Sequence, residues 1–92
     1  MAQATPGYAR ARIGLAEALV GMNRPAEAMA AYQEVTRLQP DNAVAFVNLA
    51  LLQRASGDMV GAPANLRASL KLAPGDVAAR QALIQKIGRA HV

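Results

Sequence analysis

Side chains that could act as a general acid, a general base or a metal ligand are few and scattered in this sequence. His91 is the only histidine and the penultimate residue, and chain ends are usually solvated and poorly fixed. Three aspartates flank turns, where they suit helix caps: Asp41, Asp58 and Asp76. No nucleophile, base and orienting partner occur together. We therefore expect no catalytic residue, no metal site and no cofactor, in a protein that is not an enzyme.

Charge and cysteine content narrow the class of partner. The net charge is +4, and the ten Lys and Arg residues are dispersed from Arg10 to Arg89 without a continuous basic run. Nucleic-acid binding usually requires a clustered basic patch, so nucleic acid is disfavoured as a partner and an acidic protein segment is favoured. The absence of cysteine excludes disulfides and thiolate metal sites and fits any redox compartment.

Three prolines divide the chain at a fixed interval. Pro40 lies 34 residues after Pro6, and Pro74 lies 34 residues after Pro40. A fixed period of this length is typical of helical repeat arrays. The composition agrees, because the chain is 53% hydrophobic but only 3% aromatic and its many alanines favour closely packed helices over strands. The sequence therefore predicts an all-α fold, an α-solenoid of helix-turn-helix repeats.

The N-terminal residues 1–6 lack the basic and apolar regions of a signal peptide. No stretch approaches the roughly 18 apolar residues of a membrane span. We expect a soluble protein without membrane contact, cytoplasmic if the chain is complete. Because Pro6 stands where a preceding repeat would end, the sequence also fits a fragment of a longer array. If the chain is such a fragment, its compartment is unknown.

Caps and helix breakers predict five helices. We expect them over about 7–21, 24–38, 43–56, from near Ala62 to before Pro74, and over about 77–90. The expected capping residues are Asn23, Asn42, Gly57 and Asp76. Pro63 lies too deep to be a first-position proline if Asp58 is the cap, so the fourth helix either begins near Ala62 or has a bent first turn. The short linker after the first helix makes the first two helices antiparallel.

Apolar residues at steps of three and four predict one buried face on each of the first two helices. On the first helix the expected face is Tyr8, Ala11, Leu15, Ala18, Leu19 and Met22. On the second it is Ala28, Ala31, Tyr32, Val35 and Leu38. On the fifth, a narrow stripe suits a terminal, solvated helix and consists of Leu83, Ile84 and Ile87.

Two sets of residues mark two 34-residue units, and four members of each set lie one period apart. Counted from Ala9, the first set is Leu15, Ala16, Ala28, Tyr32 and Pro40; counted from Ala43, the second is Phe46, Leu49, Ala50, Ala62 and Pro74. In this order they resemble the tetratricopeptide repeat family. The resemblance implies a tail or remnant of a preceding repeat at 1–8, repeats at 9–42 and 43–76, and a C-terminal capping helix at 77–92.

The chain also departs from the family pattern. Tryptophan is replaced by Arg12 and Arg80, tyrosine by Leu19 and Gln53, and Pro63 interrupts a helix that is normally continuous. The small and large residues of the pattern remain, so we expect the alanines to let helix axes approach closely. Three leucines are expected to insert between neighbouring helices: Leu15, Leu49 and Leu83.

The family's ligands lie in a concave groove lined by the first helix of each repeat. The resemblance implies a groove formed by Arg10, Ile13, Glu17, Val20, Val44, Val47, Asn48, Leu51, Arg54, Gln81, Gln85 and Arg89. Its floor is apolar and its rim basic, and the Asn48 amide suits a peptide backbone because it can both donate and accept. Most of the side chains that clamp a chaperone tail are missing, which argues against that ligand. Residue spacing alone does not decide whether these apolar residues bind a ligand or pack against their own array or a second copy of the chain.

These observations favour a non-catalytic protein–protein interaction module that binds an acidic, partly apolar segment of a protein or peptide partner. The alternative is an assembly module, since the upstream face of the first helix lacks a neighbour and is a candidate for homo-oligomer formation. A further alternative makes the chain an accessory segment of a larger enzyme.

Overall fold

The computed structural model describes the backbone of residues 6–90 and the side chains of residues 7–84. Within these residues the chain forms five α-helices and no strand: α1 (Pro6–Gly21), α2 (Pro25–Leu38), α3 (Ala43–Ala55), α4 (Gly61–Leu72) and α5 (Val77–Ala90). The all-α expectation is confirmed. The helix bounds agree with the expected ones to within one or two residues.

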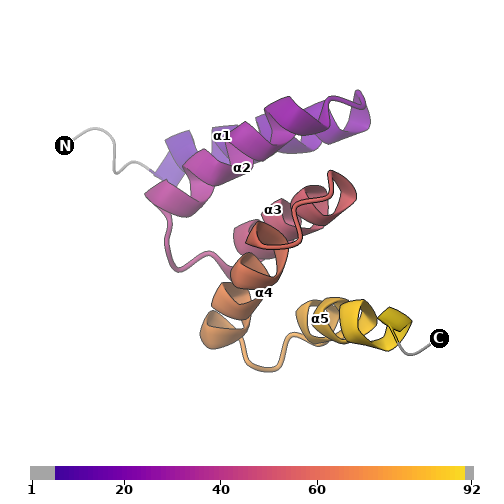
Figure 1. The fold of residues 1–92 in the computed structure, drawn as a ribbon. Coiled ribbons are helices and arrows are strands. Elements are labelled where there is room, and N and C mark those ends of the chain that lie inside the picture. Colours follow the sequence, from indigo (N-terminus) through magenta and orange to yellow (C-terminus); the bar gives the residue numbers. More distant parts are fainter. Residues whose placement is uncertain (1–5, 91–92) are drawn as a thin grey trace.

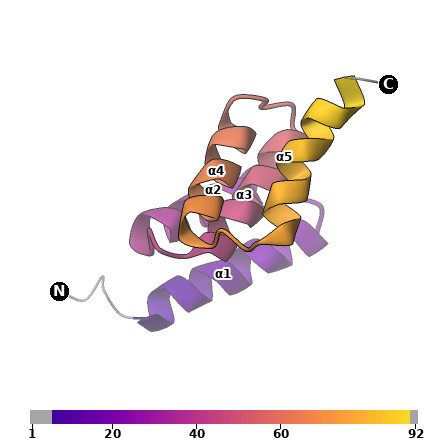
Figure 2. The ribbon, with the colours of Figure 1, turned by 90° about the horizontal axis from the view of Figure 1, so that it is seen from below.

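The helices pack in chain order as an array of hairpins (Figures 1 and 2). α1 lies against α2, α2 against α3, α3 against α4, and α4 against α5. α1 with α2 and α3 with α4 form two antiparallel hairpins, and α5 follows as a single helix (Figure 1). This helical repeat arrangement confirms the expected solenoid.

The helix ends are fixed by the residues that the sequence indicates. Asn23 adopts φ 60°, in the left-handed region that ends a helix, and Gly57 adopts φ 94° after α3. The Asn42 side-chain oxygen accepts from the Ala45 amide at 3.1 Å at the start of α3. The Asp76 carboxylate accepts from the Ala79 amide at 3.2 Å at the start of α5. These caps are local, so the sequence alone suffices to place them.

The start of α4 resolves the position of Pro63. The Asp58 carboxylate accepts from the Gly61 amide at 2.7 Å and from the Val60 amide at 3.2 Å. Pro63 is therefore the third residue of a helix that begins at Gly61. The first four N–H groups of a helix have no hydrogen-bond partner within it, so the N–H that proline lacks costs nothing at this position. A Cβ on Gly61 would lie 2.5 Å from Asp58 Oδ2, so this glycine allows the close approach.

The core consists of two alanine-rich clusters, one on each side of α3. The first cluster contains Ala16, Leu19, Ala28, Ala31, Tyr32 and Leu49. The second contains Val47, Ala50, Ala62, Leu66, Ala79 and Ala82. The fully buried alanines let neighbouring helices approach closely. The expected face of α2 is confirmed, with Leu38 half-buried at its end.

The expected buried face of α1 is wrong for most of its residues. Leu19 is buried, but the rest of that face is exposed and consists of Tyr8, Ala11, Leu15, Ala18 and Met22, here called the α1 outer stripe. Leu49, one period after Leu15, is 3% exposed because it packs against α2, whereas Leu15 is 40% exposed. Among the described residues, no helix precedes α1 to cover Leu15.

Polar contacts also join α1 to α2, beside the apolar contacts of the first core cluster. Arg12, in the position of the family's tryptophan, pairs with Glu34 at 3.4 Å and lies 5.3 Å from the centre of the Tyr8 ring. The Tyr8 hydroxyl donates to Glu34 at 2.8 Å. Ion pairs that remain accessible to solvent add little stability, so the buried alanines and Leu19 hold the hairpin.

The narrow apolar stripe expected on α5 is only partly covered. Ala79 and Ala82 are buried and Leu83 is half-buried, but Ile84 is exposed. Ile84 follows Ala50 by one period, and Ala50 is covered by α4. Among the described residues, no second helix follows α5 to cover Ile84 in the same way. The side chain of Ile87 lies outside the described residues.

Candidate functional site

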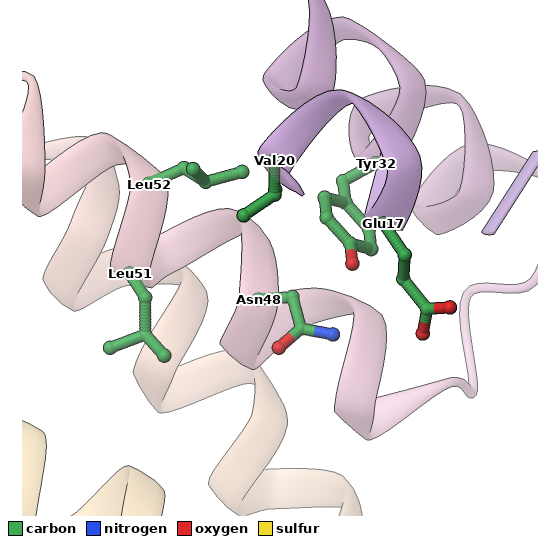
Figure 3. Close-up of a pocket in the computed structure, with 6 residues that line it drawn as sticks. All are labelled: Glu17, Val20, Tyr32, Asn48, Leu51 and Leu52. Carbon is green, nitrogen blue, oxygen red and sulfur yellow. The ribbon is translucent and has the colours of Figure 1, made fainter. Parts of the chain in front are cut away.

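Four of the residues expected in a groove meet at one pocket. Glu17 and Val20 come from α1, and Asn48 and Leu51 come from α3 (Figure 3). The pocket has a volume of about 290 Å³. The two helices lie next to each other at this point because α2, which packs against both, holds them together.

Two further residues line the pocket that the groove expectation omits. Tyr32 projects from α2 into the gap between the other two helices, and Leu52 adds an apolar wall from α3 (Figure 3). Tyr32 belongs to the first core cluster, so its ring is buried while its hydroxyl reaches the pocket. The sequence does contain a signal for Tyr32: it is the only aromatic residue on the alanine-rich face of α2, and a side chain of this size reaches beyond its own helix.

The pocket has two unlike ends (Figure 3). The Tyr32 hydroxyl, the Asn48 amide and the Glu17 carboxylate lie on one side. Val20, Leu51 and Leu52 lie on the other side. Because Val20 and Leu51 are both exposed, this apolar end is open to a partner.

The environment of Tyr32 keeps its phenol protonated. Burial of the ring raises the pKa of Tyr32 above its ordinary value of 10.0, and the nearby Glu17 carboxylate raises it further. A hydrogen bond with the Asn48 side chain acts in the opposite direction and lowers this pKa. The pocket therefore contains a neutral hydroxyl, which can donate or accept, beside one carboxylate.

Two residues of the expected groove do not line an open surface. Val47 is only 9% exposed and packs in the second core cluster, between α3, α4 and α5. Arg54 is half-buried, and its guanidinium donates to the Ala82 carbonyl at 3.2 Å. Both placements have one cause: α5 packs over the side of α3 that carries these two residues.

The remaining groove residues do not reach the pocket. Ile13 is half-buried, and three others are exposed elsewhere on the first helices of the repeats: Arg10, Val44 and Gln81. The side chains of Gln85 and Arg89 lie outside the described residues. The basic rim expected from the sequence is therefore absent at the pocket, where the charged lining residue is Glu17.

A family model described as tetratricopeptide repeat matches residues 2–41 and 13–77, which together span most of the chain. The chain belongs to the tetratricopeptide repeat family. Tetratricopeptide repeats generally mediate protein–protein interaction and are generally non-catalytic. No curated protein is similar enough to the chain to be counted as a relative.

The described part of the tetratricopeptide array was also compared with the requirements of a metal site and of a membrane span. No group of three or more His, Cys, Asp or Glu side chains within the described residues is placed to hold a metal ion. None of the described helices is both long and apolar enough to cross a bilayer. The pocket between α1 and α3, which gathers four residues of the expected groove, is the candidate site.

Proposed function

We propose that this chain is a non-catalytic interaction module that binds an extended, partly apolar segment of a partner protein across α1 and α3. The observation that carries the proposal is the pocket between these helices, whose apolar residues Val20 and Leu51 are 47% and 42% exposed. Apolar side chains grouped around a hollow lose water favourably when a partner covers them.

The size and polarity of the pocket fit a single side chain of a peptide. Pockets for small molecules and cofactors usually measure about 300–1,000 Å³, and this one, at about 290 Å³, lies just below that range. Asn48 lies beside the pocket and carries both a donor and an acceptor, the two groups that a peptide bond requires. A peptide backbone along α3 with one side chain in the pocket satisfies both features.

The acidic character expected of the partner finds no support at the pocket. Arg54 is occupied by the Ala82 carbonyl, and Glu17 is the charged residue of the lining. Arg10 is exposed and the whole chain carries a net charge of +4, so a partner with acidic residues outside the pocket remains compatible with the proposal.

The proposal is tested by peptide selection on the whole chain. Peptides selected from a random linear library are measured by fluorescence anisotropy against the wild type, Leu51→Gln and Leu72→Gln. Leu72 at the end of α4 is 43% exposed, which matches the 42% of Leu51, but it lies outside the pocket. We expect Leu51→Gln to weaken binding by roughly tenfold and Leu72→Gln to leave it unchanged. Equal binding to both variants would contradict the proposal.

A second candidate function is self-association through the α1 outer stripe. Its support is that Leu15 is exposed, whereas the leucine one period later is buried against a preceding helix. A second copy could bury this stripe as α2 buries Leu49. Sedimentation velocity at increasing concentrations tests this candidate: we expect the apparent mass to rise for the wild type and to stay constant for Leu15→Gln. A monomer at every concentration would refute it.

A further inference from the structure

The division of the pocket into an apolar and a polar end indicates what kind of side chain fits it. Leu51, Leu52 and Val20 form the apolar end, and a carboxylate, an amide and a phenol form the other (Figure 3). Lysine and arginine have the same division, an aliphatic stem that packs on apolar surface and a cationic tip. Both tips carry donors only, so they require acceptors at the polar end.

Glu17 is the acceptor in the pocket that carries a charge. Most other described acids are already engaged: Glu27 with Arg24, Glu34 with Arg12 and Arg37, and Asp58 and Asp76 with backbone amides. Glu17 makes no ion pair with any described residue, and its side chain points toward the pocket edge from α1 (Figure 3). It is therefore available to a cation that a partner brings.

One neighbouring polar group suits the same cation. The Tyr32 hydroxyl stays neutral, and its oxygen can accept a hydrogen bond. The Asn48 side chain presents its amide nitrogen on the side of Tyr32 and Glu17, and its carbonyl oxygen points away from them (Figure 3). An arginine or lysine tip at this end would thus meet two oxygen acceptors from two helices: those of Glu17 and Tyr32.

Other side chains fit the pocket less well. An acidic side chain would place a second negative charge beside the Glu17 carboxylate, and like charges repel at close range. A wholly apolar side chain would cover the Glu17 carboxylate without giving it a partner, which is unfavourable for a charged group. The net charge of +4 opposes a strongly basic partner, although charges beyond about 8 Å are screened at physiological salt. One basic residue in an otherwise neutral or acidic segment meets all of these conditions.

We propose that the pocket binds one lysine or arginine side chain of the partner segment, with its stem against Leu51, Leu52 and Val20 and its tip at the Glu17 carboxylate. This inference rests on the proposed function of the same site and adds the chemistry of the residue that the site selects. It also replaces the acidic partner expected from composition with a basic residue at this one position.

The test uses the highest-affinity selected peptide and a charge exchange. Its basic residue is replaced by norleucine, which keeps the stem, or by glutamate, and each peptide is measured against the wild type, Glu17→Gln and Glu17→Lys. We expect norleucine to weaken binding to the wild type by about two- to fivefold, the range of an exposed ion pair, and to change nothing for Glu17→Gln. Glu17→Lys should prefer the glutamate peptide. Glu27→Gln, which removes an exposed acid outside the pocket, is the matched control and should bind as the wild type does.

The outcomes separate this inference from the function on which it rests. Peptides that depend on Leu51 but carry no basic residue coupled to Glu17 would overturn the inference and leave the proposed function standing. Peptides that depend on neither residue, or a selection without any binder, would overturn both. Concentration-dependent association that Glu17→Lys abolishes would make a second copy of the chain the occupant and would also overturn the inference.

Discussion

Leu15 and Leu49 occupy the same position one period apart but have opposite surroundings, so replacing each with alanine tests the repeat packing. Leu49 is 3% exposed and contacts the alanines, Leu19 and Tyr32 of the first core cluster. Its replacement should cost about 2–5 kcal/mol of unfolding free energy, the range for a buried leucine that leaves a cavity. Leu15 is 40% exposed and borders solvent, so its replacement leaves no closed cavity and should cost about 1 kcal/mol or less.

Urea unfolding followed by circular dichroism measures both costs. The measurements belong at low protein concentration, where self-association through the α1 outer stripe would not add stability. The stability of so small a domain is near the lower end of about 5–15 kcal/mol, so Leu49→Ala can lose much of its folded population. Leu49→Met, expected to cost less than about 1.5 kcal/mol, keeps the comparison measurable. An equal loss of unfolding free energy in the two alanine variants, or a larger loss for Leu15→Ala, would refute the burial of Leu49 and the exposure of Leu15.

Three further predictions follow from single sites. Asn42→Ala removes the α3 cap and should cost about 1 kcal/mol in the same urea assay, whereas Asp41→Ala, at the exposed neighbour, should cost less than half as much. Because burial raises the pKa of Tyr32 in the folded state, the stability linked to that phenol is fully present below about pH 10 and is lost as pH rises through the raised pKa. In a Tyr8→Phe background, ultraviolet titration should detect the Tyr32 tyrosinate only above the ordinary pKa. Titration of Tyr32 at the ordinary pKa would contradict the burial of its phenol. Val47→Glu places a carboxylate in the second core cluster, so it should abolish the cooperative thermal transition and not only weaken peptide binding. A thermal melt like that of the wild type would show that Val47 is accessible to solvent.

The sequence predicts the helices better than the faces they bury. Helix ends depend on local chemistry, such as the Asn42 cap, the left-handed Asn23 and the restriction imposed by Pro63, so each can be located without knowledge of the fold. Burial of Leu15 depends on whether another helix lies beside it. The period identifies the position of Leu15 correctly, but it carries no information on whether that position is covered.

The candidate site shows the same division between local and long-range information. Glu17 and Leu51 lie at groove positions and line the pocket, since each is an exposed residue on the first helix of a hairpin. Val47 and Arg54 lie one turn away, where α5 covers them, and the angle at which α5 packs is a long-range property. Tyr32 enters the pocket from a different helix, which periodicity on a single helix cannot indicate. The boundaries of the repeats at 9–42 and 43–76 stay a prediction.

The position of α3 between the two core clusters has a consequence for local unfolding. Leu49 belongs to one cluster, whereas Val47 and Ala50 belong to the other, so adjacent residues of one helix stabilise opposite ends of the array. In a linear array with nearest-neighbour coupling, either end can open while the other stays intact. Amide hydrogen exchange should therefore be slowest in α3 and faster toward both ends, with α5, which lacks a following helix among the described residues, exchanging early. A partner segment bound between α1 and α3 would couple the first hairpin to this slowest-exchanging helix.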